Sequence, residues 1–296
     1  MKTTSCIIAA GLLTALPLVS AHAAINRVVE QTFTVQPGGT LKVETSGGNV
    51  TVQPGSDDQV HVVAHQKIRA KSEAEADELL THLTLNLAQT GNDVTAAAKY
   101  EKRLSGFHFG WWPPVTVSFV VTVPANFNAN LHTSGGDITI GDLSGKIEGR
   151  TSGGDVGVGH IDGDVRIGTS GGDIQLVAAT GRADLETSGG DITLGSVAGS
   201  LDAHTSGGDI KASISGKLTS DCSLGTSGGD VTVNVDRGVG FDLDASTSGG
   251  DVDATGLTIT IERGGIGKNR LAGPVNGGGP RLRLRTSGGD VTVRAR

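Results

Sequence analysis

The sequence predicts an all-β fold, a single-chain parallel β-solenoid (β-helix) with coils of about 18–21 residues and a small α+β N-terminal cap or insertion. The string Thr-Ser-Gly-Gly-Asp occurs eight times, and the first five copies, from Thr133, start 18 residues apart. Glycine accounts for 47 of 296 residues, whereas only two residues are tryptophan and one is tyrosine. A fixed period of this length is typical of one supersecondary unit stacked on copies of itself.

Each repeat contains two short runs in which apolar and polar residues alternate. In the repeat that begins at Thr169, Ile174 and Leu176 form the first run, and Ala183 and Leu185 flank a polar residue in the second. Alternation at period two places the apolar side chains on one face of a strand. Each repeat therefore supplies two strands and two turns, and stacking equivalent strands about 4.8 Å apart gives one continuous interior.

The Gly-Gly-Asp segment forms a turn in every coil. We expect glycine there because a tight corner requires backbone torsions that residues with a Cβ avoid, and aspartate because its side chain accepts hydrogen bonds from nearby backbone N–H groups. The predicted turn residues are Gly135, Gly136, Asp137, Gly153, Gly154, Asp155, Gly171, Gly172, Asp173, Gly189, Gly190, Asp191, Gly207, Gly208, Asp209, Gly228, Gly229, Asp230, Gly249, Gly250, Asp251, Gly288, Gly289 and Asp290.

Stacking would bring the turn aspartates into one column, where neighbouring carboxylates repel each other. Either hydrogen bonds from turn N–H groups or a ladder of bound calcium ions would relieve this repulsion. Calcium-binding β-rolls use a Gly-Gly-x-Gly-x-Asp nonapeptide, and the Gly-x-Asp element is missing from these repeats. We therefore predict structural hydrogen bonding, with no metal site and no cofactor.

We divide the chain into a signal peptide (1–23), an N-terminal β region with a short helix and a hairpin (24–130), and the repeat solenoid (131–296) with a glycine-rich surface loop at 263–280. Lys2, an uncharged apolar stretch and the small residues around His22 fit the pattern of a cleaved signal. The alternative is an uncleaved anchor, but the apolar stretch is shorter than the roughly 20 residues that span a bilayer. We expect an exported protein, in the periplasm or at the cell surface or beyond it, with no integral membrane segment after cleavage.

The N-terminal region departs from the repeat. Ser72 followed by Glu75 is a capping box, and the leucine spacing predicts a helix over 73–83. Strands are expected at 84–89, 94–99 and 115–123, the first two forming a hairpin. Such a non-repeating segment suits a solenoid end, which would otherwise expose its core.

Charge and cysteine content narrow the choice of partners. The formal charge is −7, which does not favour binding to nucleic acid. Cys222, the one cysteine that remains after cleavage, is expected to be a buried core thiol rather than a reactive one. His61 and His65 share one face of a strand without a third ligand nearby in the sequence, so a zinc site is not expected.

Two further segments contain distinctive side chains. Phe107, Phe109, Trp111 and Trp112 are clustered within six residues; they either pack the cap onto the first coil or form an exposed tip that binds a partner or a sugar. The strand at 281–285 alternates arginine with leucine, and as the last strand of the stack its arginines would discourage edge-to-edge aggregation.

A family resemblance adds to these inferences. The Ser-Glu-Ala-Glu-Ala helix, the passage VTVPANFNANLHTSGGDITI, the TSGGD coils and the ending NGGGPRLRLRTSGGDVTV resemble the bacterial putative-adhesin β-strand-repeat family (domain of unknown function 4097 type). The similarity covers nearly the whole mature chain. It implies a β-solenoid and an exported protein, and it brings no catalytic residues.

Since every identifiable polar motif is periodic, the sequence favours a non-enzymatic structural or adhesion-type protein. It would present a repetitive surface to a protein or polysaccharide ligand of the cell envelope. The alternative is a carbohydrate-active β-helix enzyme, similar to a polysaccharide lyase or hydrolase. That enzyme would need a singular cluster of acids and bases in a groove, and no catalytic residue is identified.

Overall fold

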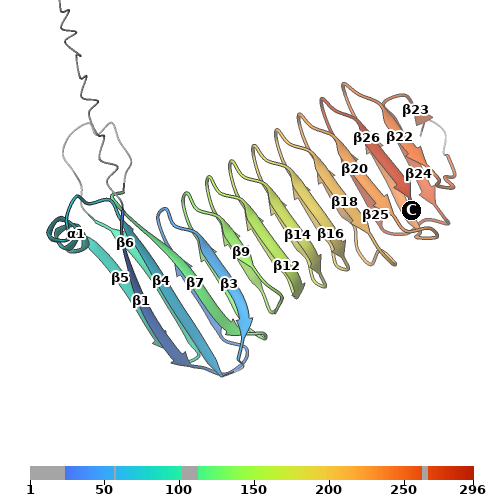
Figure 1. Cartoon of the computed structure of the whole chain (residues 1–296). Helices are drawn as coiled ribbons and strands as arrows, with labels where there is room; N and C mark the ends of the chain where they lie inside the picture. The colour runs from blue at the N-terminus through green and yellow to red at the C-terminus, as the bar shows by residue number, and fades with distance from the viewer. Residues whose placement is uncertain (1–23, 57, 102–112, 262–265) are drawn as a thin grey trace, which may run out of the picture.

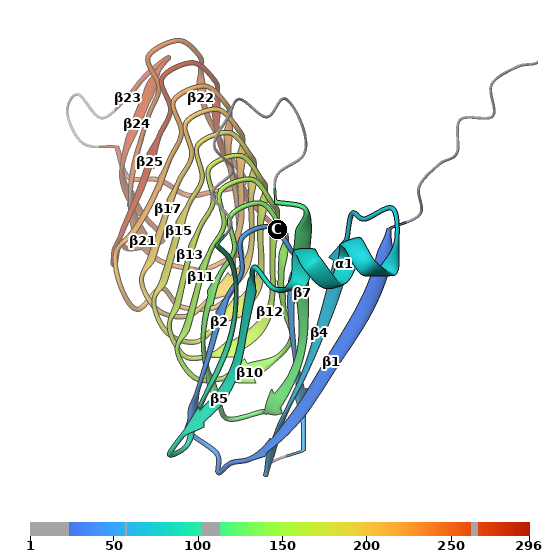
Figure 2. The same cartoon turned by 90° about the vertical axis from the view of Figure 1, so that its left-hand side faces the viewer.

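The computed structural model describes residues 24–56, 58–101, 113–261 and 266–296. These residues form one helix and two sheets of 13 strands each, which we call sheet A and sheet B. The two sheets face each other along the whole molecule and enclose one hydrophobic core (Figures 1 and 2). The predicted all-β, mostly parallel architecture is therefore confirmed.

In spatial order, the strands of sheet A are β1 (Ile25–Thr34), β4 (Gln59–Ile68), β7 (Val115–Pro124), β3 (Val50–Gly55), β9 (Ile138–Ile140), β12 (Val156–Asp162), β14 (Ile174–Ala179), β16 (Ile192–Val197), β18 (Ile210–Ile214), β20 (Val231–Val235), β26 (Val291–Ala295) and β22 (Val252–Thr255), with β10 (Leu143–Ser144) beside β12. Those of sheet B are β23 (Ile266–Gly267), β24 (Arg270–Val275), β21 (Phe241–Ser246), β25 (Arg281–Arg285), β19 (Cys222–Gly225), β17 (Leu201–His204), β15 (Ala183–Glu186), β13 (Val165–Gly168), β11 (Ile147–Arg150), β8 (Asn128–His132), β2 (Thr40–Glu44), β6 (Asp93–Tyr100) and β5 (Leu83–Thr90).

The middle coils stack in register. Val156 of β12 lies beside Ile174 of β14, and Val165 of β13 lies beside Ala183 of β15, each 18 residues further along the chain. The inward side chains, such as that of Leu185, are almost completely buried. The core is therefore built from contacts between equivalent positions of neighbouring coils, and not from residues far apart in the sequence as in most globular domains.

The reason for the second glycine of the motif differs from the one we expected. None of the Gly-Gly pairs in the motif has a positive φ. Instead, a Cβ on Gly172 would lie 2.0 Å from the carbonyl oxygen of Gly154 in the preceding coil. The first glycine, Gly171, has no such restriction, since its Cβ would meet neighbours at ordinary contact distances of 3.7–3.9 Å. Close approach between coils, rather than backbone torsion, excludes side chains at the second position.

The motif threonines connect consecutive coils inside the turn. The hydroxyl of Thr187 donates to the carbonyl oxygen of Gly172 at 2.9 Å, and it also accepts a long hydrogen bond of 3.4 Å from the N–H of Gly190. All eight motif threonines and Thr45 are buried. The threonine hydroxyl thus supplies the hydrogen-bond donor for a buried glycine carbonyl, which would otherwise be destabilising.

At both ends the order of coils departs from the order of the chain. At the N-terminal end β3 lies between β7 and β9, although β7 follows β3 in the sequence. At the C-terminal end β26 lies between β20 and β22, and β25 lies between β19 and β21. The expectation that 281–285 forms an end strand is therefore wrong: β25 is paired on both sides.

The predicted surface loop at 263–280 is also wrong in part. Residues 270–275 form β24, which pairs antiparallel with β21 and buries Leu271 and Val275. β23 continues the sheet antiparallel to β24. Leu271 and Val275 fall at alternate positions with Gly273 between them, and the strand forms because β21 offers an unpaired edge.

The N-terminal region contains helix α1 (Glu73–Leu80) and the antiparallel hairpin of β5 and β6. The Ser72 hydroxyl caps the helix by accepting from the N–H of Glu75, whose carboxylate in turn accepts from the N–H of Lys71 at 2.7 Å. The helix is shorter than predicted because Thr81, the C-cap, bonds back to Glu78. Among the described residues, no helix is both long and apolar enough to span a bilayer.

Candidate functional site

The two outer faces of the solenoid differ in charge. From β3 to β16 the outward residues of sheet A are mostly uncharged, with His160 and Asp162 of β12 as the exceptions; the uncharged ones are Thr51, Gln53, Thr139, Gly157, Gly159, Gln175, Val177, Thr193 and Gly195. On sheet B most of the outward positions carry charge, including Glu148, Arg150, Arg166, Asp184, Glu186, Asp202, His204, Arg283 and Arg285. Sheet B is therefore the face on which a charged ligand would be recognised.

The turn aspartates form a hydrogen-bonded ladder. The Oδ1 atom of Asp155 accepts from the backbone N–H of Asp173 at 2.8 Å, and Asp173 Oδ1 accepts in the same way from Asp191. The ladder begins at Asn49, whose amide oxygen accepts from the N–H of Asp137. Within the described residues, no group of three acidic, histidine or cysteine side chains is arranged to hold a metal ion. One oxygen of each of these carboxylates is therefore used in a hydrogen bond to the next coil.

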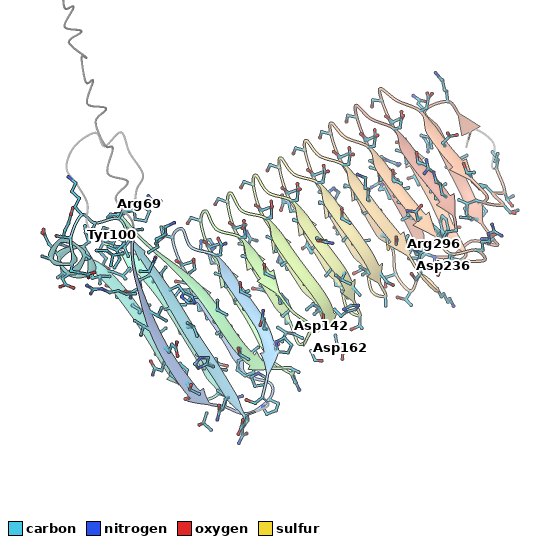
Figure 3. The ribbon with its side chains drawn as sticks, in the orientation of Figure 1. Arg69, Tyr100, Asp142, Asp162, Asp236 and Arg296 are labelled. Atoms are coloured by element: carbon cyan, nitrogen blue, oxygen red, sulfur yellow. The ribbon has the colours of Figure 1, made fainter. Side chains whose placement is uncertain are left out.

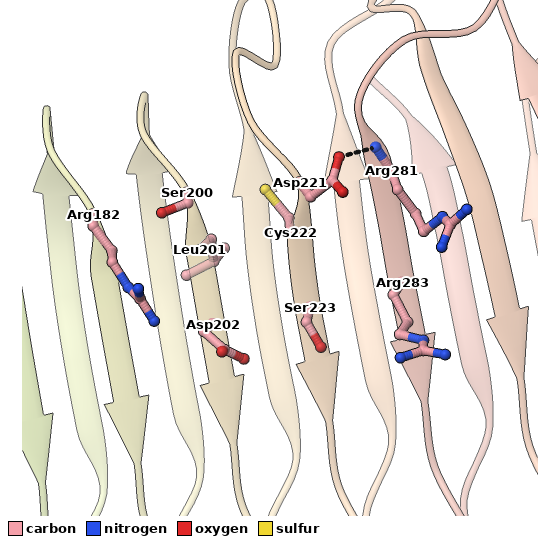
Figure 4. Close-up of a pocket in the computed structure, with 9 residues that line it drawn as sticks. All are labelled: Arg182, Ser200, Leu201, Asp202, Asp221, Cys222, Ser223, Arg281 and Arg283. Atoms are coloured by element: carbon pink, nitrogen blue, oxygen red, sulfur yellow. Dashed lines mark hydrogen bonds between the residues drawn. The ribbon is translucent and has the colours of Figure 1, made fainter.

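A hollow of about 340 Å³ opens on the outer face of sheet B (Figure 4). It crosses four neighbouring strands, β15, β17, β19 and β25, which parallel pairing holds side by side. Small side chains in the centre and long ones at the rim create its shape. Its lining consists of Arg182, Ser200, Leu201, Asp202, Asp221, Cys222, Ser223, Arg281 and Arg283.

The three arginines of the hollow are only loosely engaged by the protein. Arg182 and Arg283 lie 4.0 and 3.9 Å from the carboxylates of Asp184 and Asp244, and their side chains remain 60% and 55% exposed. The Arg281 backbone N–H bonds to Asp221 Oδ1 at 2.8 Å, whereas its guanidinium extends away from this contact (Figure 4). Guanidinium groups present several donors in a planar fork that fits carboxylate, sulfate or phosphate.

The two acidic groups of the hollow differ. Asp221 Oδ1 accepts the Arg281 N–H, whereas Asp202 Oδ1 is buried without a hydrogen-bond partner among the described residues, although His204 Nε2 lies 2.8 Å away. Cys222 is buried and unpaired, as predicted, and burial raises the pKa of its thiol. The hollow thus combines three solvated guanidinium groups with one hydrogen-bonded carboxylate, one carboxylate with a buried unsatisfied oxygen, and a buried thiol.

The structure brings together some predicted residues and not others. All the turn residues of the motif line one edge of the solenoid, in a single column per position. The aromatic cluster Phe107, Phe109, Trp111 and Trp112 lies outside the described residues, as does the predicted signal peptide. His61 Nδ1 lies 2.9 Å from the Thr32 hydroxyl and belongs to no metal-like cluster of described residues.

Sequence reasoning did not find the hollow. Arg182 and Arg281 are 99 positions apart, and stacking in chain order would have placed two coils between β19 and β25. The one available signal is the alternation of arginine and leucine at 281–285, which by itself predicts an exposed edge strand. The insertion of β25 next to β19 turns that edge into the rim of a site.

Comparisons with known proteins place the chain in a family. A solved structure described as a putative adhesin from Bacteroides fragilis is 14% identical and covers 91% of this chain and 97% of its own, with a TM-score of 0.45. Another so described, from Parabacteroides distasonis, is 11% identical with the same coverage and a TM-score of 0.43. No curated protein matches the chain. The sequence profile described as Toastrack DUF4097 matches residues 39–294, and the chain belongs to this family.

Proposed function

We propose that the protein is an exported, non-enzymatic adhesion-type scaffold that binds an acidic polysaccharide of the cell envelope along sheet B. The observation that carries this proposal is the hollow with Arg182, Arg281 and Arg283 at its rim. Arg182 and Arg283 form only long, exposed ion pairs of 4.0 and 3.9 Å, so an incoming carboxylate or sulfate displaces only weak internal contacts. Export is supported by the apolar, small-residue character of residues 1–23.

The face around the hollow suits a polymer rather than a single small molecule. Charged residues recur from coil to coil, with Arg166 Nη2 3.4 Å from Asp184 Oδ2 and Lys146 Nζ 2.6 Å from Glu148 Oε1. Successive coils, and with them the equivalent charged residues, lie about 4.8 Å apart. A flexible polymer with repeated acidic groups can contact several coils at once and gain avidity from them. The hollow would hold one of its acidic groups most tightly.

Binding of the purified protein to an acidic and a neutral polysaccharide tests the proposal. Polygalacturonate and dextran are suitable probes, compared by titration calorimetry at low and at physiological salt. We expect binding to polygalacturonate only, and weakening by salt because the contacts are solvent-exposed. Reproducible turnover of either polymer, lost on one point substitution, would replace the scaffold by the carbohydrate-active enzyme.

The arginine variants locate the site. Arg182→Gln and Arg283→Gln should each weaken binding about tenfold, since a hydrogen bond to a charged group is worth about 1.5 kcal/mol or more. Arg294→Gln is the control, because Arg294 is exposed on β26 of sheet A and does not line the hollow. Equal losses in all three variants would mean that general charge, and not the hollow, attracts the polymer.

A further inference from the structure

Residues 281–296, which we call the C-terminal strap, lie inside the stack and not at its end. The strap consists of β25 and β26. β25 separates β19 from β21 in sheet B, and β26 separates β20 from β22 in sheet A. The coil that contains the strap is thus inserted between two coils that precede it in the sequence (Figure 1).

The strap is bonded on both sides along its length. Asp290 joins the aspartate ladder twice: its N–H donates to Asp230 Oδ1 at 2.7 Å, and its Oδ1 accepts from the N–H of Asp251 at 2.8 Å. At the end of the chain, Arg296 Nε donates to Asp236 Oδ1 at 2.8 Å (Figure 3). The inward side chains of the strap have no exposed surface; they are Leu282, Leu284, Val291 and Val293.

The slot that holds the strap is defined by residues that come earlier in the chain. β20 and β22 both pair with β26 and not with each other, so they stand two strand spacings apart, about 9.6 Å. Before the strap is added, this slot presents two facing rows of unpaired N–H and C=O groups and an open strip of core. Such edges pair readily with any strand of matching pattern.

A short hinge connects the strap to β24. Residues 276–280 cross the end of β21, and Asn276, Gly277 and Gly278 all have positive φ values, of 49°, 92° and 83°. A hollow of about 550 Å³ lies beside the hinge and is lined in part by Gly278, Gly279 and Pro280. The hinge therefore borders open space, and its glycines accommodate other backbone conformations at little cost.

We propose that this slot is a binding site for the strap of a second copy of the chain, so that copies exchange their straps and form a dimer or a longer oligomer. Every strand pairing, ladder hydrogen bond and buried leucine contact of the strap is the same whether it comes from its own chain or from another. Only the hinge has to change, which is the condition under which domain swapping occurs at low cost. The strap carries Arg281 and Arg283 of the polysaccharide hollow, but the exchange does not require a bound polysaccharide.

Deleting Gly277–Gly279 tests the exchange. The two remaining hinge residues can no longer pass the end of β21, where Gly240 lies close to the carbonyl of Gly278, so the strap cannot return to its own slot. We expect a folded dimer or larger species by light scattering coupled to size-exclusion chromatography, with the same β circular dichroism as the intact chain. A folded monomer would overturn the proposal.

A cut chain decides the question if the deletion prevents folding. A protease site is inserted after Gly278 in the full chain, which is folded and then cleaved, so that the strap is held only by noncovalent contacts. A fluorescent peptide of residues 281–296 should then replace the resident strap and co-elute with the protein. A peptide with Leu282→Asp and Leu284→Asp is the control, and incorporation no greater than that of the control would overturn the proposal.

Discussion

The middle coils and the C-terminal coil have the same motif and nearly the same hydrogen bonds, but the chain reaches them differently. Thr187 Oγ1 donates to a glycine carbonyl 15 residues earlier at 2.9 Å, whereas Thr286 Oγ1 donates to the equivalent carbonyl 57 residues earlier at 2.7 Å. The motif therefore determines which hydrogen bond forms, whereas the connections between strands determine how many residues separate its donor from its acceptor. The two regions should agree in equilibrium stability and differ in the order in which they form and open.

The largest effect is expected at the second glycine, which both regions share. Gly172→Ala should cost about 3 kcal/mol, because its Cβ overlaps the Gly154 carbonyl and the coils have to separate. Gly289→Ala should cost as much, since its Cβ would lie 2.3 Å from the Gly229 carbonyl. Chemical denaturation measures both losses.

Gly171→Ala is the control for these glycine variants. Its Cβ has room, so its stability should change by less than about 1 kcal/mol. If Gly289→Ala proved harmless while Gly172→Ala was not, the C-terminal coil would be able to shift outward, and the equivalence of the two regions would fail.

Removal of one core leucine from each region sharpens the comparison. Leu185 and Leu284 lie in the same inward column of sheet B and are both buried. Each Leu→Ala change should cost about 3 kcal/mol through lost burial and the cavity that it leaves. Hydrogen exchange should separate them: Leu284→Ala should speed exchange in β25, β26 and the strand edges that pair with them, whereas Leu185→Ala should affect the coils around β15. Identical exchange patterns would show that the strap does not open as a unit.

A smaller effect is expected for the aspartate ladder. Asp173→Ala leaves the N–H of Asp191 without its acceptor and should cost about 1 kcal/mol. Asp173→Asn keeps an acceptor, as Asn49 does at the start of the ladder, and should cost less than about 0.5 kcal/mol. Thermal unfolding with and without calcium completes the test. A melting temperature that rises by several degrees in millimolar calcium would show that the carboxylates bind cations instead.

The smallest effect concerns pH and the end of the strap. The hydrogen bond from Arg296 holds the pKa of the Asp236 carboxyl below its ordinary 3.8. A lowered pKa stabilises the folded state above the ordinary value, and this contribution is lost as the pH falls through the lowered one. Strap opening, followed by hydrogen exchange, should therefore accelerate slightly below about pH 4. Arg296→Ala should abolish this pH dependence, and a dependence that survives the substitution would assign it to other groups.

The sequence by itself determined the coil. A fixed period, two alternating runs and a recurrent Thr-Ser-Gly-Gly-Asp turn specify two strands per repeat, since these local patterns decide which face each side chain takes. The same patterns located the capping box at Ser72 and the buried thiol of Cys222, as the structure shows.

Only the tertiary structure decided the order of the coils, and with it the candidate site. All coils offer the same edge pattern, so nothing local distinguishes Thr226 or Thr247 as the neighbour of Thr286. The choice depends on β24, which pairs with β21 and returns the chain to the slot beside β19. Arg281 and Arg182 meet at one hollow for this reason alone. The second glycine was likewise recognised from sequence, but its physical cause, the contact with a neighbouring backbone, exists only once the coils are stacked.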